Sequence, residues 1–196
     1  MEILGKILGT PARVKIMRLF LLNKGQGFST ATIAKRSRVN TDAARKEVRL
    51  LGSVGFIKKK SSASSEWVFN PSVQYREQLE DLLVRSDTFN SEYISDNFKK
   101  VGKIKLFITA GVFIKNSNSR VDLLLVGDKM NRGKIEDGIH KLEAELGTEL
   151  TYAVFETKEF LYRLSMYDKL VRDIIDFPHE VLFQAKELST QALNKP

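Results

Sequence analysis

The feature that most constrains this chain is an amphipathic segment around residue 45 that is followed by two closely spaced glycines. Ala44, Val48 and Leu51 recur at the spacing of one helical face, which predicts a helix from residue 40 or 41 to residue 51. The opposite face of this helix carries three cations, with an aspartate near its start: Arg45, Lys46, Arg49 and Asp42. Such a helix has to bury its narrow apolar side against other elements and leaves its charged side in solvent.

The residues before this segment predict two further helices. Residues 10–22 begin with a threonine and a proline, which suit the cap and the first position of a helix, and continue with an apolar helical stripe. Residues 29–36 predict a second, shorter helix, which a short turn at 38–40 separates from the basic helix. Phe20 and Phe28 are expected in the core. The three helices together predict a small helical bundle with one basic side.

Two strands are expected after the glycines. Residues 56–60 and 66–69 are rich in β-forming residues and are joined by a serine-rich tip at 61–65. The first strand ends in three consecutive cations, Lys58, Lys59 and Lys60. We expect Trp67 and Phe69 on the second strand to pack on the helices. The segment therefore predicts a basic β-hairpin directly behind the basic helix.

This order of elements resembles the winged helix-turn-helix domains of bacterial and archaeal regulators. The resemblance covers about residues 8–70, and residues 39–57 look like the recognition helix of that family followed by its "leucine-x-x-x-glycine-hydrophobic" approach to the wing. It implies that the basic helix lies in the major groove of DNA, where the edges of all four base pairs can be distinguished. It also implies that the hairpin acts as a wing.

The resemblance and the charge pattern together assign DNA contact to nine residues. They are Asn40, Thr41, Asp42, Arg45, Lys46, Arg49, Lys58, Lys59 and Lys60. Arg45 or Arg49 can form a bidentate contact with guanine, worth about 1–3 kcal/mol of discrimination. The start of the helix can hold a phosphate through backbone N–H groups, and the lysines can contact phosphates or the minor groove. The alternatives are a merely solvated basic face and a domain that binds protein.

The distribution of charge predicts two domains with different partners. Residues 1–70 contain 14 Lys and Arg against 4 Asp and Glu, a net charge of +10, whereas the remaining residues carry 18 and 20, a net charge of −2. A basic domain is expected to bind a polyanion. We therefore predict a DNA-binding domain at 1–70, a linker helix at 71–88 and a second domain at 89–196. The absence of cysteine excludes disulfides and thiolate chemistry.

The second domain is predicted to be a small α/β domain, so that the whole chain is α+β. Its pattern after residue 102 is strand, strand, helix, strand, helix. The expected strands lie at 104–112, 121–126 and 150–155, and the expected long helix at 132–146. Two amphipathic helices, at 75–85 and from 90 or 91 to about 100, are expected before them.

Residues 107–127 resemble the nucleotidyltransferase motif, with departures at its reactive positions. In active members of that family a glycine-serine pair binds a nucleoside triphosphate, and an aspartate-x-aspartate on the next strand holds Mg²⁺. Here Asp122 matches the second aspartate, Arg120 replaces the first, and Gly111 stands between Ala110 and Val112 in place of the glycine-serine pair. The third carboxylate has no match near residues 151–154. We therefore expect a degenerate domain without catalysis, metal or cofactor, and an ion pair between Arg120 and Asp122.

The sequence as a whole is similar to uncharacterised prokaryotic regulators with this two-domain layout. We predict a cytoplasmic, sequence-specific regulator of transcription that binds double-stranded DNA as a homodimer and has no membrane contact. The second domain would serve dimerisation or the sensing of an unidentified small-molecule or nucleotide effector, for which Gly111, Arg120 and Asp122 are the candidate residual nucleotide or anion site. The alternatives are a nucleotidyltransferase that uses Asp122 and Mg²⁺, and a module that binds RNA or protein.

Overall fold

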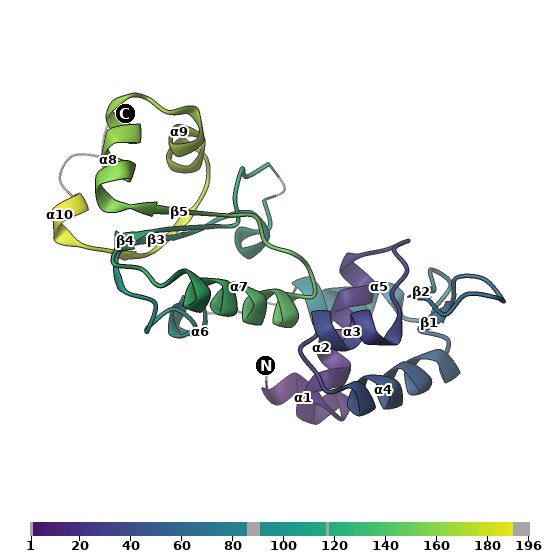
Figure 1. The fold of residues 1–196 in the computed structure, drawn as a ribbon. Coiled ribbons are helices and arrows are strands. Elements are labelled where there is room, and N and C mark those ends of the chain that lie inside the picture. Colours follow the sequence, from purple (N-terminus) through teal and green to yellow (C-terminus); the bar gives the residue numbers. More distant parts are fainter. Residues whose placement is uncertain (1, 86–90, 117, 190–196) are drawn as a thin grey trace. The chain divides into compact units, whose positions relative to one another are not determined.

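The computed structural model describes residues 2–85, 91–116 and 118–189, and it shows a mixed α+β chain (Figure 1). The N-terminal region is helical and the C-terminal region contains a sheet. Contacts between residues divide the chain into two compact units, which are described separately: 1–88 with 140–149, and 89–139 with 150–196. Across the described ranges, no helix combines the length and the apolarity that crossing a membrane requires.

The three helices predicted in the first unit are present and begin at the predicted caps. They are α2 (Pro11–Leu22), α3 (Thr30–Arg36) and α4 (Thr41–Ser53), and a short helix that was not predicted, α1 (Glu2–Leu8), precedes them. The side chains of Thr10, Ser29 and Asn40 accept hydrogen bonds from backbone N–H groups three residues later, at 3.0, 3.1 and 2.7 Å. Each cap satisfies an amide that the helix itself leaves unpaired, so the starts of these helices are set locally.

The predicted hairpin is formed by β1 (Ile57–Lys59) and β2 (Trp67–Phe69), which pair antiparallel. Both strands are shorter than expected. Phe28 forms an isolated antiparallel bridge to Trp67, with its N–H donating to the Trp67 carbonyl at 2.9 Å. This bridge ties the hairpin to the segment that precedes α3.

The core of the first unit contains the aromatic residues that the sequence placed there. Phe20 and Phe28 are buried with their rings 5.7 Å apart, edge to face. Phe69 is buried, and Trp67 packs against the same cluster from its rim. A Cβ atom at Gly52 would lie 2.9 Å from the Trp67 ring, so the glycine allows the indole to approach the end of α4 closely. The expectation that both hairpin aromatics pack on the helices is confirmed.

The segment after the hairpin differs from the single helix expected at 75–85. It consists of α5 (Arg76–Glu80) followed by a wider π-helical turn, η1 (Asp81–Arg85). The buried Arg18 donates from Nε to the carbonyl of Leu83 at 2.6 Å and from Nη1 to the carbonyl of Glu145 at 3.0 Å. Backbone carbonyls at the ends of two other segments of this unit are therefore satisfied by one buried arginine on α2.

The second unit is built on a four-stranded mixed sheet in the order β5-β4-β3-β6. The strands are β3 (Lys103–Thr109), β4 (Leu123–Asp128), β5 (Tyr152–Glu156) and β6 (Glu180–Gln184). β3 is antiparallel to both β4 and β6, whereas β4 and β5 are parallel. The three predicted strands are present with shifted ends. β6 was not predicted as a strand.

Helices cover both faces of this sheet, and apolar side chains of β3 point alternately to the two faces. Leu106 and Ile108 pack with residues of α8 (Thr157–Ser165) and α9 (Lys169–Asp176), which lie on one face in Figure 1. Phe107 points to the other face, where its ring lies 5.1 Å from that of Phe98.

Of the two other helices predicted around these strands, one is shorter than expected and one has the predicted bounds. Phe98 follows α6 (Ser91–Asp96), which is shorter than the helix expected to residue 100. The helix expected at 132–146 is present as α7 (Arg132–Leu146), and α10 (Lys186–Ser189) follows β6.

Candidate nucleic-acid interface and the Asp122 turn

Helix α4 divides its side chains between core and solvent as the sequence predicted. Ala44, Val48 and Leu51 are buried against the other helices of the first unit. The three cations predicted on the outer face are all exposed: Arg45, Lys46 and Arg49. The helix is therefore anchored by one apolar stripe and exposes three cations along its other side.

The start of α4 carries the other three predicted contact residues of the helix. Asn40 accepts the N–H of Ala43 with its side-chain oxygen, so this oxygen is used within the helix cap. Thr41 and Asp42 are exposed in the first turn. The Asp42 carboxylate pairs with Arg45, with 2.9 Å between Oδ1 and Nη1. An anion that bound at this end would meet the free backbone amides of the first turn beside an aspartate.

The three lysines predicted on the hairpin are also exposed, but two of them have neighbours on the hairpin itself. The Lys59 ammonium lies 4.3 Å from the centre of the Trp67 ring. The Lys60 ammonium lies 2.9 Å from a carboxylate oxygen of Glu66. Ile57 of β1 is buried, whereas the three lysines that follow it are exposed.

Four of the predicted contact cations form no ion pair with a carboxylate in the part of the chain that the structure describes. They are Lys46, Arg49, Lys58 and Lys59. These cations come from two elements that pack together, α4 and β1. A phosphate can bind such a cation without breaking an ion pair of the protein, so these cations are the favoured phosphate contacts.

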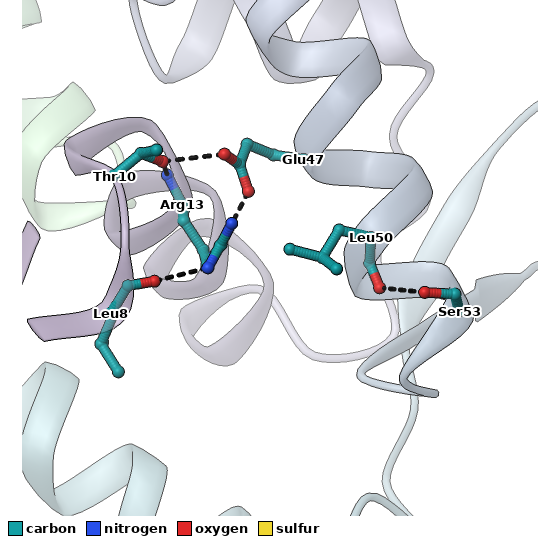
Figure 2. Close-up of polar contacts among 6 residues, drawn as sticks. All are labelled: Leu8, Thr10, Arg13, Glu47, Leu50 and Ser53. Carbon is teal, nitrogen blue, oxygen red and sulfur yellow. Dashed lines mark hydrogen bonds and ion pairs between the residues drawn. The ribbon is translucent and has the colours of Figure 1, made fainter.

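A buried glutamate that sequence reasoning missed fixes α4 in place (Figure 2). Glu47 is 2% exposed and accepts hydrogen bonds from Thr10 Oγ1 and from Arg13 Nε, both at 2.8 Å. Arg13 also donates from Nη1 to the carbonyl of Leu8 at 2.6 Å. Glu47 follows Ala44 by three positions and precedes Leu51 by four, so its place on the buried face could have been read from the spacing.

Asp122 of the second unit is bound by the backbone on both sides. Its Oδ1 accepts the N–H of Val112 and its Oδ2 accepts the N–H of Thr151, both at 2.8 Å. Val112 belongs to the short 3₁₀ helix η2 (Gly111–Ile114), which replaces the last residues of the strand expected at 104–112. Gly111 has φ +53°, and a Cβ atom there would collide with Asp122 Oδ1. The carboxylate therefore joins the η2 turn to the segment before β5.

The expected ion pair between Arg120 and Asp122 is wrong. Arg120 Nε instead lies 2.8 Å from Oδ2 of Asp173 on α9. The prediction assumed that both residues lie on one strand, where side chains two positions apart share a face. β4 begins only at Leu123, so that alternation does not apply to either residue. Gly111 and Asp122 are brought together, whereas Arg120 is directed to a different partner.

No further carboxylate joins Asp122 in the described residues. Glu149 pairs with Arg36 of its own unit, with 3.4 Å between the charged groups. Glu156 is exposed at the start of α8. Within the described ranges, no group of three or more His, Asp or Glu side chains is arranged to hold a metal ion.

Comparison with known proteins adds no relative to these observations. No model of a known protein family matches the chain, and neither the curated proteins nor the solved structures contain a match. The functional argument therefore depends on the residues and contacts described above.

Proposed function

We propose that the chain is a sequence-specific regulator of transcription that binds double-stranded DNA through a winged helix-turn-helix domain in residues 1–70. The observation that carries this proposal is the set of exposed cations on α4 and β1 that pair with no carboxylate of the described residues: Lys46, Arg49, Lys58 and Lys59. A basic helix surface that is continued by a basic hairpin suits the major groove and its flanking phosphates.

In this proposal the two elements divide the work of recognition. The exposed face of α4 lies in the major groove, where Arg45 or Arg49 donates to guanine O6 and N7. Lys58, Lys59 and Lys60 contact the phosphate backbone and supply affinity that does not depend on sequence. The buried Glu47 accepts hydrogen bonds from Thr10 and Arg13 and so fixes α4 against the start of α2. In this proposal the contact sets the orientation of the DNA-reading face.

We propose that the second unit supports dimerisation or ligand sensing and does not transfer nucleotides. Both oxygens of Asp122 accept backbone N–H groups, and Arg120 pairs with Asp173. A carboxylate that is held in this way is a structural group in the turn rather than an open ligand for Mg²⁺. A homodimer fits the proposal because two half-sites supply more specificity than one small module.

The decisive test of DNA binding is charge reversal on α4. DNA selected from a random duplex pool by the native protein would be titrated by fluorescence anisotropy against the native protein and Arg45→Glu/Arg49→Glu. The exchange removes two positive charges from the groove and adds two negative ones, so we expect binding to weaken by about 100-fold or more. The matched control Lys134→Glu/Lys158→Glu reverses two exposed cations of the second unit. We expect it to change affinity by about threefold at most.

Equal losses in both double variants would contradict the proposal, as would native binding that random duplex competes fully. Stronger binding of A-form RNA than of duplex DNA would favour the RNA-binding alternative, since α4 needs a B-form major groove. Incubation of the native protein with labelled nucleoside triphosphates and Mg²⁺ tests the enzymatic alternative. Transfer of label by the native protein would overturn the non-catalytic assignment of the second unit.

A further inference from the structure

Asp42 is an acidic residue at the N-terminal end of the proposed DNA-reading face. It lies in the first turn of α4, and its side chain is 91% exposed beside the exposed cations of the same helix. Its carboxylate pairs with Arg45, whose side chain is 63% exposed. A negative charge at this place opposes the attraction of the domain to phosphates in general. Any role of this carboxylate in DNA binding therefore lies in the choice of sequence and not in general affinity.

The contact with Arg45 adds little stability to the free protein, because exposed pairs three positions apart on a helix are worth very little. Its effect is geometric. Arg45 Nη1 donates to Asp42 Oδ1, and the planar guanidinium has further N–H groups that can donate to another acceptor. A guanidinium whose plane is held by a carboxylate loses less rotational freedom when it binds a base edge.

We propose that Asp42 is a specificity-determining residue that positions Arg45 to read a guanine. This inference rests on the proposed function. In the major groove, Arg45 donates two hydrogen bonds to guanine O6 and N7 while Asp42 holds its plane. The second carboxylate oxygen of Asp42 accepts a hydrogen bond from the N4 amino group of a cytosine at the same or the neighbouring base pair. At a sequence without this cytosine, the carboxylate loses its water and gains no hydrogen-bond donor. The cost weakens binding to such sequences.

The hairpin contains a comparable exposed ion pair in which a lysine takes the place of the arginine. Lys60 and Glu66 also lie 2.9 Å apart, and both are partly exposed. A lysine ammonium is a point charge without the planar fork of arginine, and the hairpin faces the backbone in the proposed complex. Removal of the Glu66 charge should therefore raise affinity for every duplex by a similar factor. Removal of the Asp42 charge should change the choice between duplexes.

The experiment compares native protein, Asp42→Asn and the matched control Glu66→Gln, each of which lacks one negative charge of the basic domain. Dissociation constants would be measured for the selected duplex, for random duplex and for duplexes with single G·C pairs replaced by A·T. For Asp42→Asn we expect the preference for the selected duplex over random duplex to fall by about tenfold or more. The loss should be confined to one or two adjacent base pairs. For Glu66→Gln we expect this preference to change by less than about threefold.

Three results would overturn the inference. Asp42→Asn could keep the native preference for the selected duplex, or it could lose affinity for the selected and the random duplex by the same factor. Glu66→Gln could also lower the preference as much as Asp42→Asn does. Asp42 also lies in the first turn of α4, so Asp42→Ser, which retains a polar residue at the helix start, provides a second variant. Thermal unfolding followed by the fluorescence of Trp67 shows whether the variants fold. If native protein itself does not distinguish selected from random duplex, the proposed function fails and this inference falls with it. Discrimination by native protein that survives in both Asp42 variants removes the inference alone.

Discussion

The outer face of α4 and the turn around Asp122 both carry charged residues that the sequence marked as candidates, but they use their charges differently. On α4 the side chains of Lys46 and Arg49 are exposed, and neither has an acidic partner in the described chain. At the turn, both oxygens of Asp122 are occupied by backbone N–H groups. One region keeps its charges available for a partner molecule, and the other uses its charge to hold the fold together.

This difference shows that the type of a residue is a weaker guide to function than the state of its hydrogen bonds. A carboxylate that two backbone amides hold is costly to remove and poorly placed to bind a ligand. Substitution of an exposed cation without a partner changes the free energy of unfolding little, and such a cation can bind an anion. Stability and binding measurements should therefore respond in opposite ways to substitutions in the two regions.

The largest effect on stability is expected from Asp122→Ala. The change leaves the N–H groups of Val112 and Thr151 without their charged acceptor, which should cost about 3 kcal/mol. Urea unfolding followed by far-UV circular dichroism measures this loss. Fluorescence of Trp67, the single tryptophan of the chain, reports on the first unit and should change less.

The control for this prediction is Asp176→Ala, which removes an exposed carboxylate that pairs with Arg172 one helical turn away. It should cost no more than about 0.5 kcal/mol. A similar, small loss in both variants would show that Asp122 is not held as tightly as its two contacts indicate. The contrast between a structural carboxylate and a surface carboxylate would then disappear.

A smaller loss of stability is expected from Glu47→Gln in the first unit. The substitution keeps the shape of the side chain but removes the buried charge that Arg13 and Thr10 contact, which should cost about 2 kcal/mol. Urea unfolding followed by Trp67 fluorescence measures it, with Glu66→Gln on the exposed hairpin as the comparison. If the hairpin variant were destabilised equally, burial of the Glu47 pair would have no special part in holding α4.

The smallest effect concerns pH and the Lys105 cluster of the second unit. The Lys105 ammonium lies 2.8 Å from Glu187 and 3.0 Å from Asp128. Hydrogen bonds to Glu187 and Asp128 raise the pKa of Lys105, and the Lys105 ammonium lowers the pKa of Glu187. The stabilisation from Glu187 is therefore complete above its ordinary pKa of about 4.3 and is lost as pH falls through the lowered pKa. The contribution from Lys105 is lost only as pH rises above about 10.

We accordingly expect Lys105→Met to reduce the difference between the melting temperatures of the second unit at pH 7 and at pH 3. Scanning calorimetry measures this difference. Glu159→Gln serves as the control, because it removes a carboxylate of an exposed pair elsewhere in the same unit. An unchanged difference in the Lys105 variant would show that other carboxylates dominate the acid response.

Features that depend on neighbours along the chain were predictable from the sequence. The caps at Thr10, Ser29 and Asn40, the buried stripe of α4 and its exposed cations all follow from residues within four positions of one another. These features depend on backbone amides at fixed local offsets and on the 3.6-residue period of the helix. The composition of the candidate DNA-reading face was accordingly visible before the structure was.

Only the tertiary structure decided which charged groups are bound and which are available. Arg120 pairs with Asp173, which is 53 positions away, and Glu47 pairs with Arg13, which is 34 positions away. Such partners depend on how elements pack, because a side chain pairs with whatever charge the fold brings within hydrogen-bond distance. The same holds for β6, whose pairing with β3 joins segments that no local pattern connects. Short-range periodicity therefore determined the helices and their charged face, and long-range packing decided which of those charges remain free to meet another molecule.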